Sequence, residues 1–401
     1  MGILFICTVF IFGYYFGVKG YIFQVNNYPK VSIDRQAPPD RRELDFNLFW
    51  RVWDTVHKSY FDKSKIKDAN LIYGAIRGMV AAINDPYTIY LPPEENKIIQ
   101  EDLEGSFEGI GIQIGFKGNQ LAVVAPLPDS PADKAGIKAG DFIMGIKDKD
   151  KKIERGTVGI TLPEAVQLIR GKKGTKVTLF LLREKSEAPL EIEVTRDNID
   201  VPSVTVSYVE KDGKQIAHIK LTKFAAETLG EWEDAVVGLL TKKDLEGIII
   251  DVRNNPGGYL DDAIEIASDL LETGQVIVIQ EKSEGIKESQ KVQKLGRLKN
   301  IPVVMLINGG SASASEILAG ALRDNNRAKL VGEKSFGKGT VQESLQLEGD
   351  GGLHVTVARW LTPNGTWVND KSLVPEYEVT DNEDTEEDEQ LQKAIEIVVG
   401  S

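Results

Sequence analysis

Cysteine and histidine are scarce in this chain of 401 residues. Its single cysteine, Cys7, excludes a disulfide framework within the chain and a cysteine-based metal cluster. The three histidines, His57, His218 and His354, are scattered without the HExxH spacing of a zinc-binding helix. We therefore expect no metal site in this protein.

Positive charge is also in short supply, since 61 acidic residues outnumber 48 basic ones and give a net charge of -13. Nucleic acid and anionic membrane surfaces repel an acidic protein, so neither is expected as the main partner. The acidic stretch from Asp381 to Glu389 is typical of a solvated linker. The chain is long enough for two or three domains, each with its own core.

Charged side chains are missing from the N-terminal segment, where Met1 to Val18 carry none and Lys19 ends the run. A helix of that length reaches roughly 27 Å, close to the thickness of a bilayer's hydrocarbon core. A cleavable signal peptide is the alternative, but its apolar region usually spans only ~7 to 15 residues and follows positive charge. We favour a transmembrane anchor over residues 1–23 and keep the signal segment as the alternative.

Three regions with different residue patterns follow. Between about residues 44 and 99, apolar residues recur at helical spacing, as in LIYGAIRGMVAAI. From residue 105 to about 198, short β-branched strands alternate with glycine turns and predict a compact mixed domain. From residue 201 onward, apolar runs such as GIIIDV and IPVVMLI alternate with loops and helical segments. This pattern predicts an α/β sheet that binds ligands at the carboxyl ends of its strands.

The loops after these two apolar runs hold the candidate chemistry. RNNPGGYL follows the first run and NGGSASASEI the second, so both can expose backbone amides beside the start of a helix. Such amides suit a developing oxyanion. Ordinary strand-to-helix turns with serine N-caps have the same composition, which leaves either loop alone undecided. Ser311, Ser313 and Ser315 stand at alternate positions, and each would need a neighbouring base to act as a nucleophile.

Lysine and histidine both offer that base. His354 lies in the alternating stretch GGLHVTVARW, which predicts a mid-strand position and makes it the weaker candidate. Lys338 lies between two glycines just before a predicted strand, and burial can lower a lysine pKa by ~3 to 5 from about 10.4. Gln342 would project from the same face of an extended strand and orient the amine. The residue pattern alone allows a Ser-Lys hydrolase and leaves a solvated loop lysine open as the alternative.

Several blocks resemble those of the carboxyl-terminal processing peptidases, the tail-specific serine protease family with a PDZ domain. GSASASEILAGAL and VGEKSFGKGTVQ resemble the family's active-site blocks, and DVRNNPGG resembles its oxyanion block. SPADKAGIKAGDFIMGI resembles its PDZ domain, and NDPYTIYL with GSFEGIGIQI resembles the region that joins the N-terminal helices to that domain. The resemblance spans roughly residues 44–379 and preserves the order of the blocks.

The resemblance implies a role for each matching residue of the third region. Ser313 would be the nucleophile, Lys338 the general base and Gln342 the residue that orients the base. The backbone amide of Ala314 and one from the NPGG loop, at Gly258, would form the oxyanion hole. No cofactor is needed for this chemistry.

The resemblance also implies a PDZ groove that binds the C-terminal tails of protein substrates, because PDZ domains add an extended peptide to a strand edge. The helix from Leu162 to Arg170 would form one wall of that groove. Leu168 could equally be a core residue, and Arg170 an exposed residue at a helix end. The implied peptide-binding residues are Gly109, Ile110, Gly111, Ile112, Leu168 and Arg170.

We accordingly expect an α/β fold, with a crotonase-like protease core, an inserted PDZ domain, an N-terminal helical region and a transmembrane helix. The expected boundaries are 1–23 for the anchor or signal segment, 40–103 for the helical region, 104–198 for the PDZ domain, 199–380 for the protease core and 381–401 for the acidic linker and final helix.

The main hypothesis is a membrane-anchored endopeptidase with an extracytoplasmic body, periplasmic or on the cell surface, that cleaves through an acyl-enzyme. The resemblance leaves homodimerisation through the terminal helices open. A non-catalytic PDZ adaptor on a protease-like scaffold is the first alternative, although the retention of Ser313, Lys338 and Gln342 argues against it. A hydrolase that uses His354 as its base is the second.

Overall fold

The computed structural model describes Tyr14 and residues 21–26, 30–35, 46–118, 120–160, 162–183, 188–369, 371–380 and 387–400. The chain divides into two compact units, residues 1–76 and 77–401. In the first unit, a hairpin of β1 (Tyr21–Asn26) and β2 (Lys30–Arg35) precedes α2 (Asn47–Ser59) and the greater part of α3 (Asp68–Ala81). These helices fall where apolar residues recur at helical spacing.

The predicted membrane anchor falls almost entirely outside the described residues. Within residues 1–23, only Tyr14, which is helical, and the first residues of β1 are described. The last residues of this segment belong to the strand that begins at Tyr21, which the aromatic and β-branched sequence YIFQVN favours, and the anchor itself stays a prediction. Among the described residues, no helix is both long enough and apolar enough to cross a membrane.

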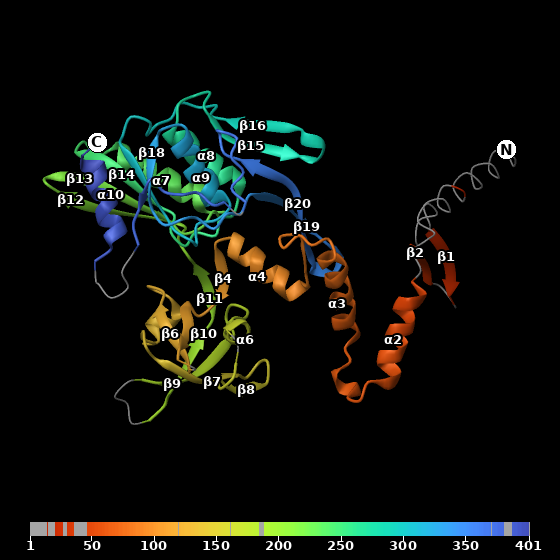
Figure 1. The fold of residues 1–401 in the computed structure, drawn as a ribbon. Coiled ribbons are helices and arrows are strands. Elements are labelled where there is room, and N and C mark those ends of the chain that lie inside the picture. The colour runs from red at the N-terminus through yellow and green to blue at the C-terminus, as the bar shows by residue number, and fades with distance from the viewer. Residues whose placement is uncertain are drawn as a thin grey trace, which may run out of the picture. The chain divides into compact units, whose positions relative to one another are not determined.

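A small β domain occupies the middle of the chain (Figure 1). Helix α4 (Pro93–Leu103) precedes it, and β4 (Ser106–Gly109) pairs with β11 (Asp197–Asp200) where the chain enters and leaves. Its sheet has the order β10-β9-β7-β6-β5, with β8 paired to β7, so β5 lies at an edge. The elements are β5 (Ile112–Lys117), β6 (Gln120–Pro126), α5 (Pro131–Lys134), β7 (Phe142–Asp148), β8 (Ile153–Gly156), α6 (Leu162–Ile169), β9 (Lys176–Leu182) and β10 (Leu190–Thr195).

The largest sheet of the third region has the order β12-β13-β14-β17-β18-β21 and is parallel from β13 to β21. Its strands are β12 (Val204–Lys211), β13 (Lys214–Leu221), β14 (Leu245–Asp251), β17 (Val303–Ile307), β18 (Ala328–Gly332) and β21 (Tyr377–Glu378). The two apolar runs of the sequence are β14 and β17, and every residue of β17 is buried. The predicted α/β sheet is confirmed.

Helices cover both faces of this sheet. One core cluster joins the sheet to α7 (Thr228–Leu240), α8 (Leu260–Leu270) and α9 (Ala314–Asp324). A second cluster joins it to α10 (Glu389–Val399), which packs so closely that a side chain at Gly247 would meet Val398. The acidic stretch before α10 is only partly described, but Asp388 is not simply solvated, because it caps α10 and pairs with Arg253.

A second sheet brings the N-terminal part of this unit beside the C-terminal strands. Its order is β16-β15-β20-β19, from β15 (Val276–Lys282), β16 (Lys287–Lys291), β19 (Thr340–Gln346) and β20 (Gly352–Leu361). Strand β3 (Ile89–Leu91) pairs antiparallel with β20, so that Ile89 lies opposite His354. The segment NDPYTIYL is thereby fixed next to β20, the strand that contains His354.

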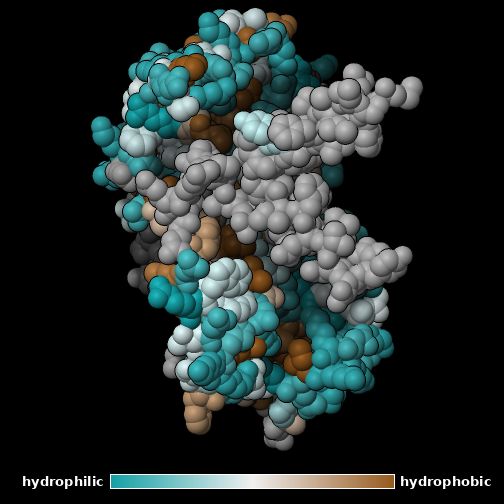
Figure 2. Space-filling view, turned by 90° about the vertical axis from the view of Figure 1, so that its right-hand side faces the viewer, coloured by the Kyte–Doolittle hydropathy of each residue, from teal (hydrophilic) through white to brown (hydrophobic). Residues whose placement is uncertain are grey.

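The hydrophilic character of the surface agrees with the many charged residues in the sequence. Figure 2 shows that the described residues on one face are mostly hydrophilic, with small hydrophobic areas between them. At the start of α6, Thr161 and Glu164 have the Thr-x-x-Glu spacing of a capping box, but Thr161 lies outside the described residues and α6 begins at Leu162.

Candidate active site

Hydrogen bonds join the two loops at the carboxyl ends of β14 and β17. The Ser311 hydroxyl donates to the Val252 carbonyl at 2.7 Å. The Ser315 hydroxyl and the Ala312 N–H both donate to the Asn255 carbonyl, at 2.9 and 3.0 Å. These bonds satisfy buried carbonyls that would otherwise be costly to leave unpaired. The loop that holds the serines and the loop that holds Pro256 to Gly258 therefore have fixed positions relative to each other.

Ser313 differs from its two neighbours in exposure and conformation. Ser311 and Ser315 are fully buried, whereas Ser313 is partly exposed and lines a pocket of about 330 Å³. Its backbone has φ 54° and ψ -115°, a conformation that costs a non-glycine residue about 1–3 kcal/mol and that clusters at functional sites. Ser313 thus presents its hydroxyl at the start of α9 while the flanking serines hold the turn in place.

Glycines bring the second loop close to Ser313. A Cβ atom on Gly257 would lie 2.8 Å from the Ser313 Cβ and 3.0 Å from the Ala314 nitrogen. Gly258 has φ 138°, and a Cβ there would lie 1.9 Å from the Phe224 carbonyl oxygen, so neither position accepts a larger residue.

The backbone N–H groups of Gly258 and Ala314 both lie at this pocket. Within the described residues, neither donates a hydrogen bond. The start of α9 adds partial positive charge. The predicted oxyanion hole therefore has two donors of suitable character on opposite loops, while its role stays a prediction.

Two tryptophans fix the backbone at Lys338. The Trp360 indole donates to the Lys338 carbonyl at 2.8 Å, and the Trp367 indole donates to the Gly339 carbonyl at 2.8 Å. The Lys338 side chain lines the same pocket as Ser313. Burial lowers the pKa of the Lys338 amine, and the nearby carboxylates of Glu316 and Asp85 act in the opposite direction. A lowered pKa is what a lysine base requires at neutral pH.

A buried carboxylate that the sequence reasoning missed connects the two predicted catalytic residues. Glu316 accepts hydrogen bonds from the N–H groups of Ser313 and Lys338, each at 2.9 Å. Its other oxygen accepts from the Gly337 N–H at 2.7 Å and from the Ser335 hydroxyl at 2.5 Å. Burial raises the pKa of Glu316, while these donors favour its ionised form. The Ser-x-x-Glu spacing of a capping box was the available signal.

Gln342 lines the pocket, but it does not make the expected contact with Lys338. Its amide nitrogen donates to the hydroxyls of Thr340 and Thr356, at 2.8 and 3.3 Å. Among the described residues, no hydrogen bond joins Gln342 to Lys338, or Lys338 to the Ser313 hydroxyl. The sequence argument assumed an unbroken strand, but β19 begins at Thr340 and its register shifts just before Gln342. Hydrogen bonds of catalytic groups often close only when substrate binds.

His354 lines the same pocket, from its predicted mid-strand position in β20. Burial and the charge of Lys338 both lower the pKa of His354. Within the part of the chain that the structure describes, no hydrogen bond orients its ring. A histidine base in a catalytic triad needs such an orienting acceptor, and its absence among the described residues weighs against His354 as the base.

The implied peptide-binding residues of the β domain lie around its edge strand. Gly109 ends β4 and Ile112 begins β5, while Ile110 is a buried core residue. Gly111 has φ 73°, and a Cβ there would lie 2.4 Å from the Ser130 Cβ. This sharp turn feeds the chain into β5, whose free edge suits the addition of a peptide strand.

The remaining two residues lie at the C-terminal end of α6. Leu168 packs against the domain core. Arg170 is not the exposed helix end that the sequence allowed, because its guanidinium lies 3.3 Å from the Glu101 carboxylate and 4.2 Å from the centre of the Phe107 ring. Both residues line a second pocket, of about 440 Å³, together with residues of α4. Arg170 therefore joins the β domain to α4.

Sequence models of known families assign a class to this architecture. Peptidase family S41 matches residues 215–379, which hold both joined loops and Lys338. A PDZ domain matches residues 123–183, and the N-terminal domain of the activating protease CtpB matches residues 9–95. The protein is a serine-type peptidase of family S41 with a PDZ domain.

Comparison with individual relatives gives a narrower assignment. The chain belongs to the carboxy-terminal processing proteases. It is 38% identical to the carboxy-terminal processing protease CtpA of Bacillus subtilis over 86% of its own length and 71% of that protein. It is 33% identical to CtpB of the same organism, over 90% and 73%. The photosystem II D1 C-terminal processing protease has a similar structure, with a TM-score of 0.51 and 29% identity over 83% of this chain and 92% of that one.

Proposed function

We propose that the protein is a serine endopeptidase that binds the C-terminal tail of a protein substrate through its PDZ domain and cleaves by a Ser-Lys pair. One observation carries the proposal. A single pocket gathers the accessible, strained Ser313, the partly buried amine of Lys338 and the backbone N–H groups of Ala314 and Gly258. A nucleophile, a base and two oxyanion donors are the parts that acyl transfer requires.

The reaction follows from these parts. Lys338 in its neutral form removes the Ser313 proton as the hydroxyl oxygen attacks the scissile carbonyl carbon. The negative charge that develops on the carbonyl oxygen is stabilised by the N–H groups of Ala314 and Gly258, and removal of one such donor typically costs about 3 kcal/mol of barrier. The protonated Lys338 then gives its proton to the leaving amine, which leaves an acyl-enzyme. Water releases the second product by the reverse sequence of proton transfers.

Tail recognition is assigned to the free edge of β5. An extended peptide there would add a strand to the PDZ sheet, and the turn through Gly111 would present backbone amides to the terminal carboxylate. The apolar residues Ile112 and Leu168 would contact alternate side chains of the tail.

Membrane anchoring and an extracytoplasmic body also belong to this proposal. The uncharged run from Met1 to Val18 supports the anchor, and membership of the family favours the extracytoplasmic body. Fractionation of cells that express the full chain tests both, because an anchored, outward-facing body remains with membranes and is digested by protease added to intact spheroplasts. Release into the soluble fraction would contradict the anchor.

The decisive experiment incubates the full-length protein in detergent with an unstructured protein that carries an apolar C-terminal tail. The wild-type protein is expected to degrade it, whereas Ser313→Ala and Lys338→Ala are not. Ser289→Ala is the control, since Ser289 is an exposed serine of β16 that does not line the pocket. Blocking the tail with a C-terminal amide should slow cleavage, because the PDZ groove would lose the carboxylate.

The two alternatives predict different results. If His354 is the base, His354→Ala abolishes cleavage and Lys338→Ala does not, a possibility that its place in the pocket makes worth testing. If the protein is a PDZ adaptor, the wild-type protein binds the tail and leaves the substrate intact. Cleavage that survives in Lys338→Ala would contradict the proposed mechanism.

A further inference from the structure

A turn from outside the S41 region reaches the predicted base. The Lys338 amine lies over the ring of Tyr87, 5.2 Å from its centre. Tyr87 belongs to the segment between α3 and β3, about 250 residues before Lys338 in the sequence and outside the residues 215–379 that match the peptidase family. Tyr87 itself is only partly exposed. A second region of the protein therefore contributes to the surroundings of the lysine.

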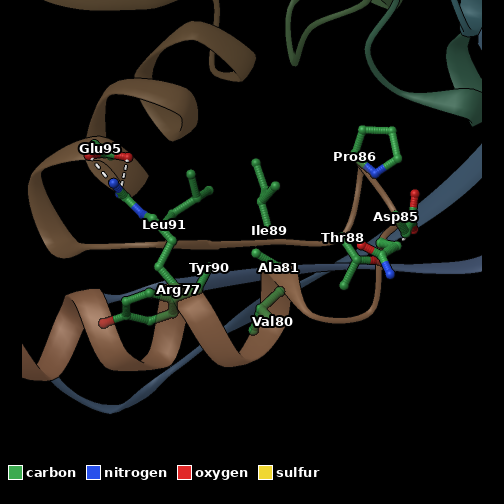
Figure 3. Close-up of a pocket in the computed structure, with 11 residues that line it drawn as sticks. Arg77, Val80, Ala81, Asp85, Pro86, Thr88, Ile89, Tyr90, Leu91 and Glu95 are labelled. Atoms are coloured by element: carbon green, nitrogen blue, oxygen red, sulfur yellow. Dashed lines mark hydrogen bonds and ion pairs between the residues drawn. The ribbon is translucent and has the colours of Figure 1, made fainter.

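The turn is held firmly enough to place the ring. The two oxygens of Asp85 accept hydrogen bonds from the Tyr87 N–H at 3.1 Å and from the Thr88 hydroxyl at 2.6 Å. Figure 3 shows Asp85 and Thr88 close together in this turn. The Thr88 hydroxyl oxygen in turn accepts from the Thr356 N–H of β20 at 3.1 Å. Pairing of Ile89 with β20 continues the attachment.

We infer that Tyr87 is a positioning residue for Lys338, with a ring that covers the amine, limits its contact with water and restricts where its flexible side chain can lie. The inference rests on the proposed Ser-Lys function. It adds to that function a requirement for a residue from the N-terminal side of the PDZ domain.

Charges around the amine explain why such a cover is needed. Lys338 faces the carboxylates of Glu316 from α9 and Asp85 from the turn, and both favour the charged ammonium. His354 of β20 and the phenol of Tyr87 are two further titratable groups beside it. Only exclusion of water works in favour of the neutral amine that the mechanism uses. An aromatic face also attracts the ammonium, but this attraction is small compared with the cost of removing an ammonium from water.

The test is the pH dependence of kcat/KM for Tyr87→Ala and Tyr87→Phe. Without the ring, water reaches the amine, so the midpoint on the acid side of the profile is expected to move up by about one pH unit. At pH values below the midpoint this shift means an approximately tenfold loss of kcat/KM. Tyr87→Phe keeps the ring face and should stay within about twofold of the wild type. Should Tyr87→Ala fail to fold, Tyr87→Ser also replaces the ring with a small side chain that lets water in, and it is expected to move the midpoint in the same direction.

A matched control lies elsewhere in the same domain. The amine of Lys242 lies 4.1 Å from the centre of the Tyr208 ring on β12, and neither residue lines the pocket. Tyr208→Ala should leave the profile unchanged. A midpoint that stays in place or moves down in Tyr87→Ala, or a phenylalanine variant as impaired as the alanine variant, would overturn the inference.

A second measurement separates this inference from the proposed function. In Ser313→Ala protein, mass spectrometry follows the rate at which an acylating reagent modifies Lys338 at different pH values. The pH at which this rate is half-maximal gives the titration midpoint of the amine without any substrate. The midpoint should rise when Tyr87→Ala is added. If the wild-type protein cleaves no substrate and the midpoint still rises, the proposed function fails and the role of Tyr87 stands. If cleavage occurs and the rise is absent, the role of Tyr87 fails alone.

Discussion

At the scale of single residues, three serines with the same chemistry have different tasks because of their partners. Ser311 and Ser315 donate to carbonyls of Val252 and Asn255, which come from a loop about 60 residues earlier in the chain. Ser313 has the strained backbone and the access to the pocket. The residue pattern could not separate them, because their partners belong to another loop, and only the family resemblance singled out Ser313.

Glu316 gives the sharpest prediction at this scale. In Glu316→Gln, an amide NH₂ replaces one carboxylate oxygen and meets N–H or O–H donors that previously had an acceptor. Hydrogen bonds to charged groups contribute about 1.5–3 kcal/mol each, so kcat/KM is expected to fall roughly 10- to 100-fold. Steady-state kinetics with a fluorogenic peptide measures this.

Two controls complete the experiment. The exposed Glu343 on β19 allows the same chemical change near the site, and Glu343→Gln should keep full activity. Glu316→Asp retains the charge on a shorter side chain. Its kcat should fall, while the midpoint of its pH profile should stay close to that of the wild type. A Glu316→Gln protein with wild-type kinetics would show that the carboxylate does not organise the site.

At the scale of elements, the buried strands were predictable and their neighbours were not. GIIIDV and IPVVMLI are long apolar runs, and both became central strands of the parallel sheet. The pairing of β3 with β20 joins residues more than 250 positions apart, and no local pattern indicates it. The shift of register before Gln342 is set by the partner strand in the same way. Local patterns therefore indicated the strands and loops that meet at the pocket but did not determine the contacts of Gln342.

The first turn of α8 carries a prediction about stability. Asp262 is buried, one of its oxygens has no hydrogen-bond partner within the described residues, and burial raises its pKa to about 6. The folded state therefore holds this proton more tightly than the unfolded state, so Asp262 weakens the fold as pH rises from about 4 to about 6. Asp262→Asn should stabilise the protein at pH 7 by about 1–2 kcal/mol.

Urea denaturation at several pH values measures this difference. The advantage of Asp262→Asn should disappear below about pH 4, where the carboxyl is protonated in both states. The exposed Asp234 of α7 supplies the control, since Asp234→Asn should lack this pH dependence. An equal gain at pH 4 and pH 7 would contradict the assigned cause.

At the scale of the whole molecule, the last helix is connected to the loop that contains Gly258. Arg253 directly precedes the loop that contains Gly258, and it bonds to both Asp251 and Asp388, each at 2.7 Å. Asp388 also accepts from the Leu391 N–H at 2.8 Å and so begins α10. The composition of the acidic stretch predicted a linker because the arginine that it meets lies 135 positions away.

Asp388→Asn is expected to weaken this connection. The guanidinium of Arg253 lowers the pKa of Asp388, so its contribution to stability is present above about pH 4 and is lost as the pH falls further. Because Asp388 is partly exposed, the loss at pH 7 should be only about 1 kcal/mol, measured by urea denaturation. Glu396→Gln breaks an exposed ion pair of the same helix and should cost less. Equal losses in the two variants would contradict a special role for Asp388.

The place of α10 has a consequence for how the protein is made. Translation delivers the loops of Ser313 and Gly258 well before residues 388–399, yet the sheet face beneath α10 and the Arg253 pair wait for those residues. A nascent chain still on the ribosome therefore carries Ser313 and Lys338 before the contacts of α10 can form. We expect the packing beneath α10 and the Arg253–Asp388 pair to be completed only after synthesis of the last helix.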